Sequence, residues 1–388
     1  MKKRPYSVPV LMFHSVGASH LDWPYRFLSE PVALFERKID YLLRRGYEFI
    51  FHDDLYHYMK GEQSLSQKAV MLTFDDGFLD NWVIAFPILK RRGVKFTIYV
   101  SQEFVDISET PRPTLEDLWD GRANEDDLQI LGYLSWAEMR RMEASGLVDI
   151  QSHTSTHTWH FVSGDIIDFY HPGNASQYPW MQWNRFPSKK PRWMLHPPEQ
   201  ELWGLPVYEN KRAMVARRYL EDPALNRMIR DFVLDNGAET FFSRTDWRKV
   251  LTQLVRRHLE KEKHHARFET DSEQEARLRY ELWDNRRAIE QALKKEVRYL
   301  CWPGGAYNDR LIRLAQDCGF RASTVKRGRN APGDDARFIH RISSGNPLGA
   351  HRFPWKNFLF TLKFYLDRFH GNAWAVALDR IYRYFSKR

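Results

Sequence analysis

The sequence has few cysteines and no long apolar run. Its two cysteines, Cys301 and Cys318, lack the spacing of a zinc site and do not resemble a disulfide framework. No stretch reaches the length of a transmembrane helix. The basic N-terminus, residues 1–5, is not followed by the apolar segment of a secretory signal. We therefore expect a cytoplasmic protein.

A recognisable nucleic-acid-binding module is also missing, so we expect no nucleic-acid partner. The net charge of +9 then favours other acidic partners, such as anionic lipid surfaces or phosphorylated intermediates. The 388 residues suffice for one large α/β domain or for two domains. Aromatic residues make up 15% of the chain, with 14 tryptophans. Sugars stack on aromatic rings, although aromatic residues also fill protein cores.

Two adjacent carboxylates follow a short apolar run. Residues Ala69 to Phe74 have the length and the β-branched and aromatic content of a buried strand, and Asp75, Asp76 and Gly77 come directly after it. One interpretation is a strand followed by an Asp-Gly turn. The other is a metal site, because neighbouring carboxylates repel each other unless a cation lies between them.

A second polar stretch favours the metal site. His153 and His157 follow another short apolar run, residues 147–150. One carboxylate and two imidazoles form a facial set of ligands that leaves positions open for water and substrate.

These two stretches resemble the signature motifs of a known family. Thr73-Phe74-Asp75-Asp76-Gly77 and His153-Thr154-Ser155-Thr156-His157 are similar to the TFDDG and H-S/T-x-x-H motifs of the polysaccharide deacetylases, carbohydrate esterases with a NodB-like domain. The resemblance implies an α/β fold, a distorted (β/α) barrel of NodB type. It also implies the permuted-motif type of this family, with a long insertion.

The order of strand and helix patterns agrees with such a barrel. Strands and helices alternate through the first part of the chain, which favours a parallel sheet with its chemistry at the carboxyl ends of the strands. We expect the first part of the barrel in residues 1–160 and its end in residues 298–349. An insertion, residues 161–297, comprises a Trp- and Pro-rich loop and then a helical segment. Residues 350–388 form a basic, aromatic, helical tail.

The insertion emerges directly after the second motif. We predict that Trp180 and Trp183 in its first part help to form a glycan groove. The alternative is a surface loop whose aromatic side chains pack on the barrel. The helical segment carries charges of both signs, which usually indicates a solvated face. It could be a helical subdomain, a dimer surface or a membrane-facing lid.

The resemblance also implies roles for single residues. Asp76, His153 and His157 would bind a divalent metal ion, zinc first, with nickel, cobalt or manganese as alternatives. Asp75 would be the general base. His14, at the end of the strand predicted for residues 9–13, fits the permuted position of the acid histidine, and His340 is the alternative.

The third motif departs from the family pattern. In Pro303-Gly304-Gly305-Ala306-Tyr307-Asn308, Gly304 replaces the usual aromatic residue. We expect Pro303 and Gly304 to contact the substrate, with a backbone amide near Gly304 supporting the oxyanion. The arginine that orients the catalytic carboxylate in this family is missing from its usual place, and Arg298 lies too far upstream. Another group must supply its contact if the enzyme is active.

The implied function is removal of acetyl groups from N-acetylhexosamine units of a glycan or lipid-linked glycan in cell-surface polysaccharide biosynthesis. Two alternatives are a non-catalytic glycan-binding protein with the same fold and an amide hydrolase that acts on a small substrate. The tail of residues 350–388 combines basic and aromatic residues, as helices at a membrane interface do. We favour peripheral contact with the inner face of an anionic membrane over packing of the tail on the barrel.

Overall fold

The computed structural model describes residues 5–197, 199–261, 265–325 and 328–343. Of the residues beyond 343 it describes only 362–363, 366–367, 369, 372 and 374. The predicted tail of residues 350–388 therefore lies almost entirely outside the described residues. Two exceptions, Leu362 and Leu366, are buried against the barrel.

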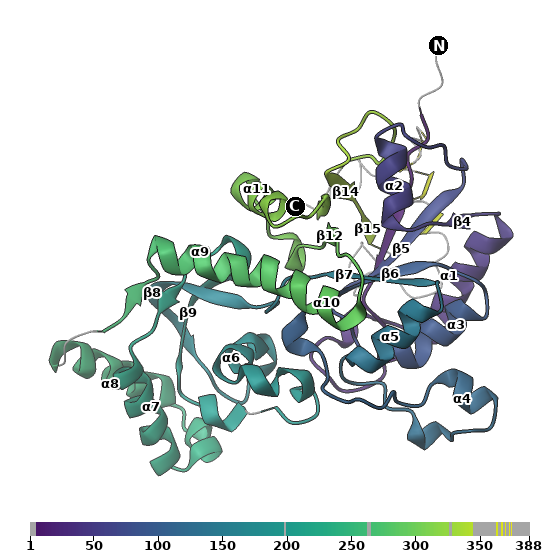
Figure 1. The fold of residues 1–388 in the computed structure, drawn as a ribbon. Coiled ribbons are helices and arrows are strands. Elements are labelled where there is room, and N and C mark those ends of the chain that lie inside the picture. Colours follow the sequence, from purple (N-terminus) through teal and green to yellow (C-terminus); the bar gives the residue numbers. More distant parts are fainter. Residues whose placement is uncertain are drawn as a thin grey trace.

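A nine-stranded sheet, in which every pairing is parallel, forms the main body within the described ranges (Figure 1). The strand order is β14-β13-β12-β7-β6-β5-β1-β15, and β4 pairs with β5. This sheet confirms the predicted barrel. Its strands are β1 (Val10–Phe13), β4 (Glu48–Phe49), β5 (Ala69–Phe74), β6 (Phe96–Val100), β7 (Val148–Ser152), β12 (Tyr299–Leu300), β13 (Ala322–Val325), β14 (Phe338–His340) and β15 (Ile342–Ser343).

The two ends of the sheet are nearly joined. β14 pairs with β13 at one end of the strand order, and β15 pairs with β1 at the other. Only Arg341 separates β14 from β15 in the sequence. The sheet thus comes close to a closed barrel, and Arg341 lies at the seam.

Residues along β5 alternate between the two faces of the sheet, as a strand requires. Val70, Leu72 and Phe74 belong to the large apolar cluster under the covering helices, whereas Met71 belongs to a smaller cluster with Val10. The smaller cluster also contains Leu55 and Met59 of α2 (His52–Met59), which packs against residues near the amino ends of the strands.

Helices cover the outer face of the sheet. Buried side chains of α1 at the spacing expected for an amphipathic helix, Phe35, Ile39 and Leu42, pack into the large cluster. The helices of the barrel are α1 (Val32–Arg44), α2, α3 (Phe86–Lys90), α4 (Leu115–Trp119), α5 (Trp136–Ala144), α9 (Asp271–Arg279), α10 (Asn285–Leu293) and α11 (Asp309–Asp317). A small parallel pair, β2 (Ser15–Val16) and β3 (Ser29–Glu30), follows β1.

The insertion forms a second lobe beside the barrel (Figure 1). Its own apolar core contains Trp180, Trp183, Trp193 and Trp203. Its elements are the antiparallel hairpin β8 (Trp159–Phe169) and β9 (Pro206–Arg212), the antiparallel pair β10 (Tyr219–Leu220) and β11 (Arg267–Phe268), and the helices α6 (Pro179–Arg185), α7 (Pro223–Asp235) and α8 (Trp247–Lys261). No helix in the described part of the chain is long and apolar enough to cross a membrane.

The end of the predicted insertion belongs to the barrel. Residues 280–284 connect α9 to α10 by a π-helical turn. Leu278, Leu282 and Ile289 on these turns are buried in the large cluster of the barrel. The apolar cluster of the barrel thus includes residues that precede the boundary predicted at residue 297. The outer face of this helix pair carries charged residues, and the opposite face carries the apolar residues that pack toward β7 and β12. The charged residues make this apolar pattern hard to recognise in the sequence.

Candidate active site

The carboxylates Asp75 and Asp76 lie at the carboxyl end of β5. Asp76 has a left-handed backbone (φ 74°), so the chain turns sharply after the strand. Gly77 continues this turn with φ 67°, and a Cβ atom there would lie 2.9 Å from a methyl carbon of Val100. The glycine of the motif is thus required by both its backbone conformation and its close contact with β6.

His153 and His157 face Asp76 from the loop after β7. Their Nε2 atoms lie 3.2 Å and 3.1 Å from Asp76 Oδ1. One ligand atom from each residue falls within 4.8 Å of the other two. The structure therefore brings together the three predicted metal ligands, although they come from two separate motifs.

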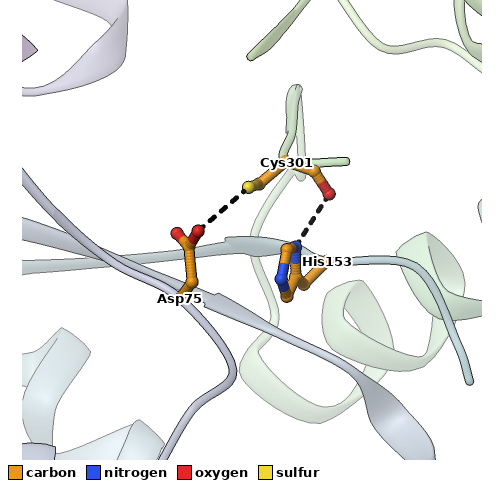
Figure 2. A group of neighbouring side chains, drawn as sticks. All are labelled: Asp75, His153 and Cys301. Carbon is orange, nitrogen blue, oxygen red and sulfur yellow. Dashed lines mark hydrogen bonds between the residues drawn. The ribbon is translucent and has the colours of Figure 1, made fainter. Parts of the chain in front are cut away.

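The donor atoms are arranged to bind a cation. His153 Nδ1 lies 2.8 Å from the backbone oxygen of Cys301 (Figure 2). An N–H must donate in that contact, which leaves the Nε2 lone pair directed at the carboxylate. Asp76 Oδ1 is buried and has no hydrogen bond among the described residues. A metal ion between these atoms would remove the clash of lone pairs, so the residues fit a divalent ion.

The electrostatics keep the carboxylate ready for a metal. Burial alone would raise the pKa of Asp76, but the two neighbouring imidazoles, His157 first and then His153, hold it well below its ordinary value. An ionised carboxylate and imidazole lone pairs are the forms that bind metals.

Glu281, on the turn between α9 and α10, and Asn285 of α10 hold the histidine loop, and sequence reasoning missed them. The loop contains two left-handed residues, Thr154 (φ 64°) and His157 (φ 44°). The buried carboxylate of Glu281 accepts hydrogen bonds from the backbone N–H groups of Ser155 (3.0 Å) and Thr156 (2.9 Å).

Asn285 makes a second connection to this loop. Its side-chain amide donates to the backbone oxygen of Val100 (3.0 Å) and to the hydroxyl of Ser152 (2.8 Å). Together, Glu281 and Asn285 fix the loop between the end of β7 and the insertion.

Arg341 supplies the contact that the third motif lacks. Its guanidinium donates to both oxygens of Asp75, at 2.6 Å and 2.8 Å. Burial would raise the pKa of Asp75, but the charge of Arg341 lowers it below its ordinary value. Arg341 also lies 3.0 Å from Cys301 Sγ. The Cys301 thiol in turn lies 3.5 Å from Asp75 Oδ2 (Figure 2).

Strand alternation narrows the choice between His340 and Arg341 but does not identify Arg341. Successive residues of a strand face opposite sides, so His340 and Arg341 cannot both point at the site. The structure directs Arg341 to Asp75, whereas the ring of His340 packs against Gly328 and lies outside the cavity lining. His340 is therefore poorly placed to be the acid. The other candidate, His14, lies beside Asp75, with 3.9 Å between His14 Nε2 and Asp75 Oδ2.

A cavity of about 530 Å³ opens over these groups. The barrel and the insertion both line it. Of the residues predicted to bind substrate, Trp183, Pro303 and Gly304 line the cavity. Trp180 does not, because its ring packs against Phe161 within the core of the insertion. Aromatic residues that the sequence did not single out, among them Tyr25, Phe27 and Trp159, complete much of the wall.

Comparisons with known proteins agree with this geometry. Over 98 residues the chain is 32% identical to YxkH of Bacillus subtilis, whose name relates it to the polysaccharide deacetylases; this covers 25% of the chain and 33% of YxkH. Over 144 residues it is 26% identical to the poly-β-1,6-N-acetyl-D-glucosamine N-deacetylase of Escherichia coli, which covers 37% of the chain and 20% of that enzyme. The chain thus spans a third or less of the length of these two relatives.

Solved structures share the fold. A de-N-acetylase from Aggregatibacter actinomycetemcomitans superposes with a TM-score of 0.52 at 19% identity, covering 86% of this chain and 94% of that one. The BpsB deacetylase domain from Bordetella bronchiseptica gives 0.51 at 19% identity, with 87% and 96% covered. The sequence profile of the family described as polysaccharide deacetylase matches residues 62–183 and 233–323, more than half of the chain. The chain belongs to the polysaccharide deacetylase family.

Proposed function

We propose that the protein is a divalent-metal-dependent N-deacetylase. Its substrate would be the N-acetylhexosamine units of a glycan or lipid-linked glycan in cell-surface polysaccharide biosynthesis. The observation that carries the proposal is the position of an ionised, arginine-bound carboxylate, Asp75, next to the metal-ligand set and inside the cavity. The relative from Escherichia coli, named for its action on an N-acetylglucosamine polymer, supports the substrate class.

The residues of the site suggest a division of roles. Asp76, His153 and His157 would hold the ion, and zinc suits this donor set best, with nickel, cobalt or manganese as alternatives. When bound, the ion polarises the acetyl carbonyl and makes water more acidic.

Asp75 would take a proton from the attacking water, since its Oδ1 atom keeps a lone pair beyond the bond to Arg341. His14 lies on the same side of the cavity and would protonate the departing amine. A backbone amide near Gly304 would stabilise the negative charge that develops on the acetyl oxygen.

The arginine also bears on the alternative of a glycan-binding protein without activity. That alternative drew its support from the missing arginine of the third motif. Arg341 makes the bidentate contact from a different strand, so the departure in the motif no longer argues against catalysis.

Metal content and acetate release test the proposal together. Elemental mass spectrometry of the purified protein should find close to one divalent ion per chain. The His157→Ala variant should lose the ion, while His196→Ala, an exposed histidine outside the site, should retain it. Metal-loaded protein should release acetate from N-acetylated oligosaccharides. Bound metal with glycan affinity but no turnover would favour the binding protein, and hydrolysis of formamides or cyclic amides alone would favour a small-substrate amidase.

We also propose a cytoplasmic location with peripheral contact of residues 350–388 with an anionic membrane. The basic and aromatic composition of the tail supports it. Flotation with phosphatidylglycerol-containing liposomes should carry the full chain, and removal of residues 350–388 should abolish this. Equal partitioning of both proteins into solution would reject membrane contact.

A further inference from the structure

Arg212, at the end of β9, brings an unpaired positive charge into the wall of the cavity. Four charged aspartate and arginine side chains line this cavity: Asp75, Asp76, Arg212 and Arg341. Both oxygens of Asp75 bind Arg341, and Asp76 faces the two histidines. Within the described ranges, no carboxylate forms an ion pair with Arg212, and its guanidinium makes no hydrogen bond.

The third motif leaves room for this guanidinium. Gly304 has a left-handed backbone (φ 54°), and a Cβ atom at this position would lie 2.3 Å from Arg212 Nε and 2.6 Å from Cζ. No residue with a side chain fits beside Arg212 as it stands. The replacement of an aromatic residue by Gly304, a departure from the family pattern, thus coincides with the place that an arginine of the insertion occupies.

The guanidinium is also held in place without being neutralised. Its Cζ lies 5.3 Å from the ring centroid of Trp159, another residue of the cavity wall. Such stacking orients the planar group and leaves its N–H donors at the edge. A guanidinium presents these donors in a fork that matches a carboxylate or a phosphate.

From this geometry we infer that Arg212 binds an anionic group of the substrate. The substrate is then an acidic glycan, with a carboxylate or phosphate close to the acetylated sugar. A divalent ion on Asp76 adds positive charge to the cavity and strengthens this preference. The inference names the substrate class of the proposed deacetylase and rests on that function. It also assigns a role in specificity to the insertion, since Arg212 belongs to the β8–β9 hairpin.

Binding measurements with three probes test the inference. The neutral probe is triacetylchitotriose, the carboxylate probe is a hyaluronan tetrasaccharide, and the phosphate probe is uridine diphosphate N-acetylglucosamine. Isothermal titration calorimetry of the metal-loaded protein should give tighter binding for at least one acidic probe than for the neutral one. Arg212→Met should weaken that acidic probe roughly tenfold or more, as expected for a hydrogen-bonded charge pair. The probe that is affected distinguishes carboxylate from phosphate.

Two further variants test whether the effect depends on the position of the Arg212 charge. Arg256→Met removes the same charge from an exposed site on α8 and should leave all three dissociation constants unchanged. Gly304→Ala should displace Arg212 and weaken the same acidic probe. Acidic probes that bind no better than the neutral one, or not measurably, overturn the inference. So does an equal loss for all probes in Arg212→Met, because that result indicates a packing role. Selective binding without acetate release would refute the deacetylase and leave the anion site standing.

Discussion

At the scale of single residues, the site depends on a pair that is 266 positions apart in the sequence, Asp75 and Arg341. The two parallel N–H···O contacts fix the carboxylate plane as well as its charge. In the proposed mechanism the two residues have separate roles: Asp75 would accept a proton, and Arg341 would determine where and at what pH it does so. Substitutions at the two positions should therefore have different signatures.

Asp75→Asn should remove the base and spare the metal ligands. We expect turnover to fall by about 10²–10⁴-fold, the usual contribution of a general base, with metal content unchanged. Acetate release and elemental mass spectrometry on the same preparation measure both quantities. Activity close to that of the unmodified protein would refute the assigned role.

Arg341→Met should move the acid limb of the pH–rate profile. Arg341 lowers the pKa of Asp75, so this carboxylate should stay ionised to a lower pH than an ordinary aspartate does. Without the guanidinium, burial dominates and the pKa of Asp75 rises. The acid limb of kcat/KM should therefore shift to higher pH.

The control for this shift is Arg337→Met, which removes an exposed arginine in the segment leading into β14. Its profile should overlay that of the unmodified protein. The same linkage predicts that the contribution of the pair to stability is fully present above the unfolded pKa of the carboxyl and is lost as the pH falls through the folded pKa. Identical acid limbs in all three proteins, at constant metal content, would contradict the assignment.

At the scale of elements, the helix pair α9–α10 connects the outside of the barrel to the loop that carries His153 and His157. Its apolar face packs into the large cluster, and its polar residues Glu281 and Asn285 hold the backbone of the loop. Burying a carboxylate costs little free energy when it and the N–H groups that donate to it are all paired. Removing the carboxylate leaves those N–H groups buried without a partner, which costs much more.

Glu281→Ala should weaken the metal site although Glu281 touches no ligand atom. Loss of such an outer contact typically reduces metal affinity by about 10–100-fold. Competition with a chelator of known zinc affinity measures the effect. Glu275→Ala, a partly exposed glutamate on the preceding turns of the same helix, should leave the affinity unchanged. Equal affinities in both variants would show that the loop holds its shape without Glu281.

Whether the sequence predicts a site residue depends on how far that residue lies along the chain from the groups it contacts. The strand Ala69–Phe74 with its two carboxylates, and the histidine pair after β7, lie in short contiguous segments with clear patterns. Arg341 and Glu281 act across more than a hundred residues, and their immediate neighbours show only a strand end and a mixed-charge helix. Trp180 and Trp183 form a third case. They are the same residue type in the same short helix, and only the packing of α6 decides which of them faces the cavity.

At the scale of the whole molecule, the barrel and the insertion lie side by side (Figure 1), and both line one cavity. The barrel contributes Asp75, Asp76 and Arg341 to the cavity wall. The insertion contributes Trp159, Trp183 and Arg212. Lys190 of the insertion, buried in an ion pair with Glu103, also donates to the backbone oxygen of Thr156 at 3.1 Å. The insertion is therefore attached to the loop that carries His153 and His157, and it also forms part of the cavity wall.

The two tryptophans of α6 should separate binding from packing. Trp183→Ala should raise KM by roughly tenfold, in line with the loss of an aromatic contact, while metal content stays the same. Trp180→Ala should leave KM unchanged and lower stability, by about 3–5 kcal/mol for a buried tryptophan. Steady-state kinetics and chemical denaturation distinguish the two. A KM that responds equally to both substitutions would argue against the division.

The position of Arg341 at the seam of the barrel has a consequence for biosynthesis of the chain. A ribosome produces both metal-binding motifs within the first 157 residues, but the guanidinium that orients Asp75 emerges only with β14 and β15. The nascent chain therefore contains the three predicted metal ligands long before it contains the arginine that binds Asp75. The contact that orients this carboxylate can form only after β14 and β15 have been synthesised.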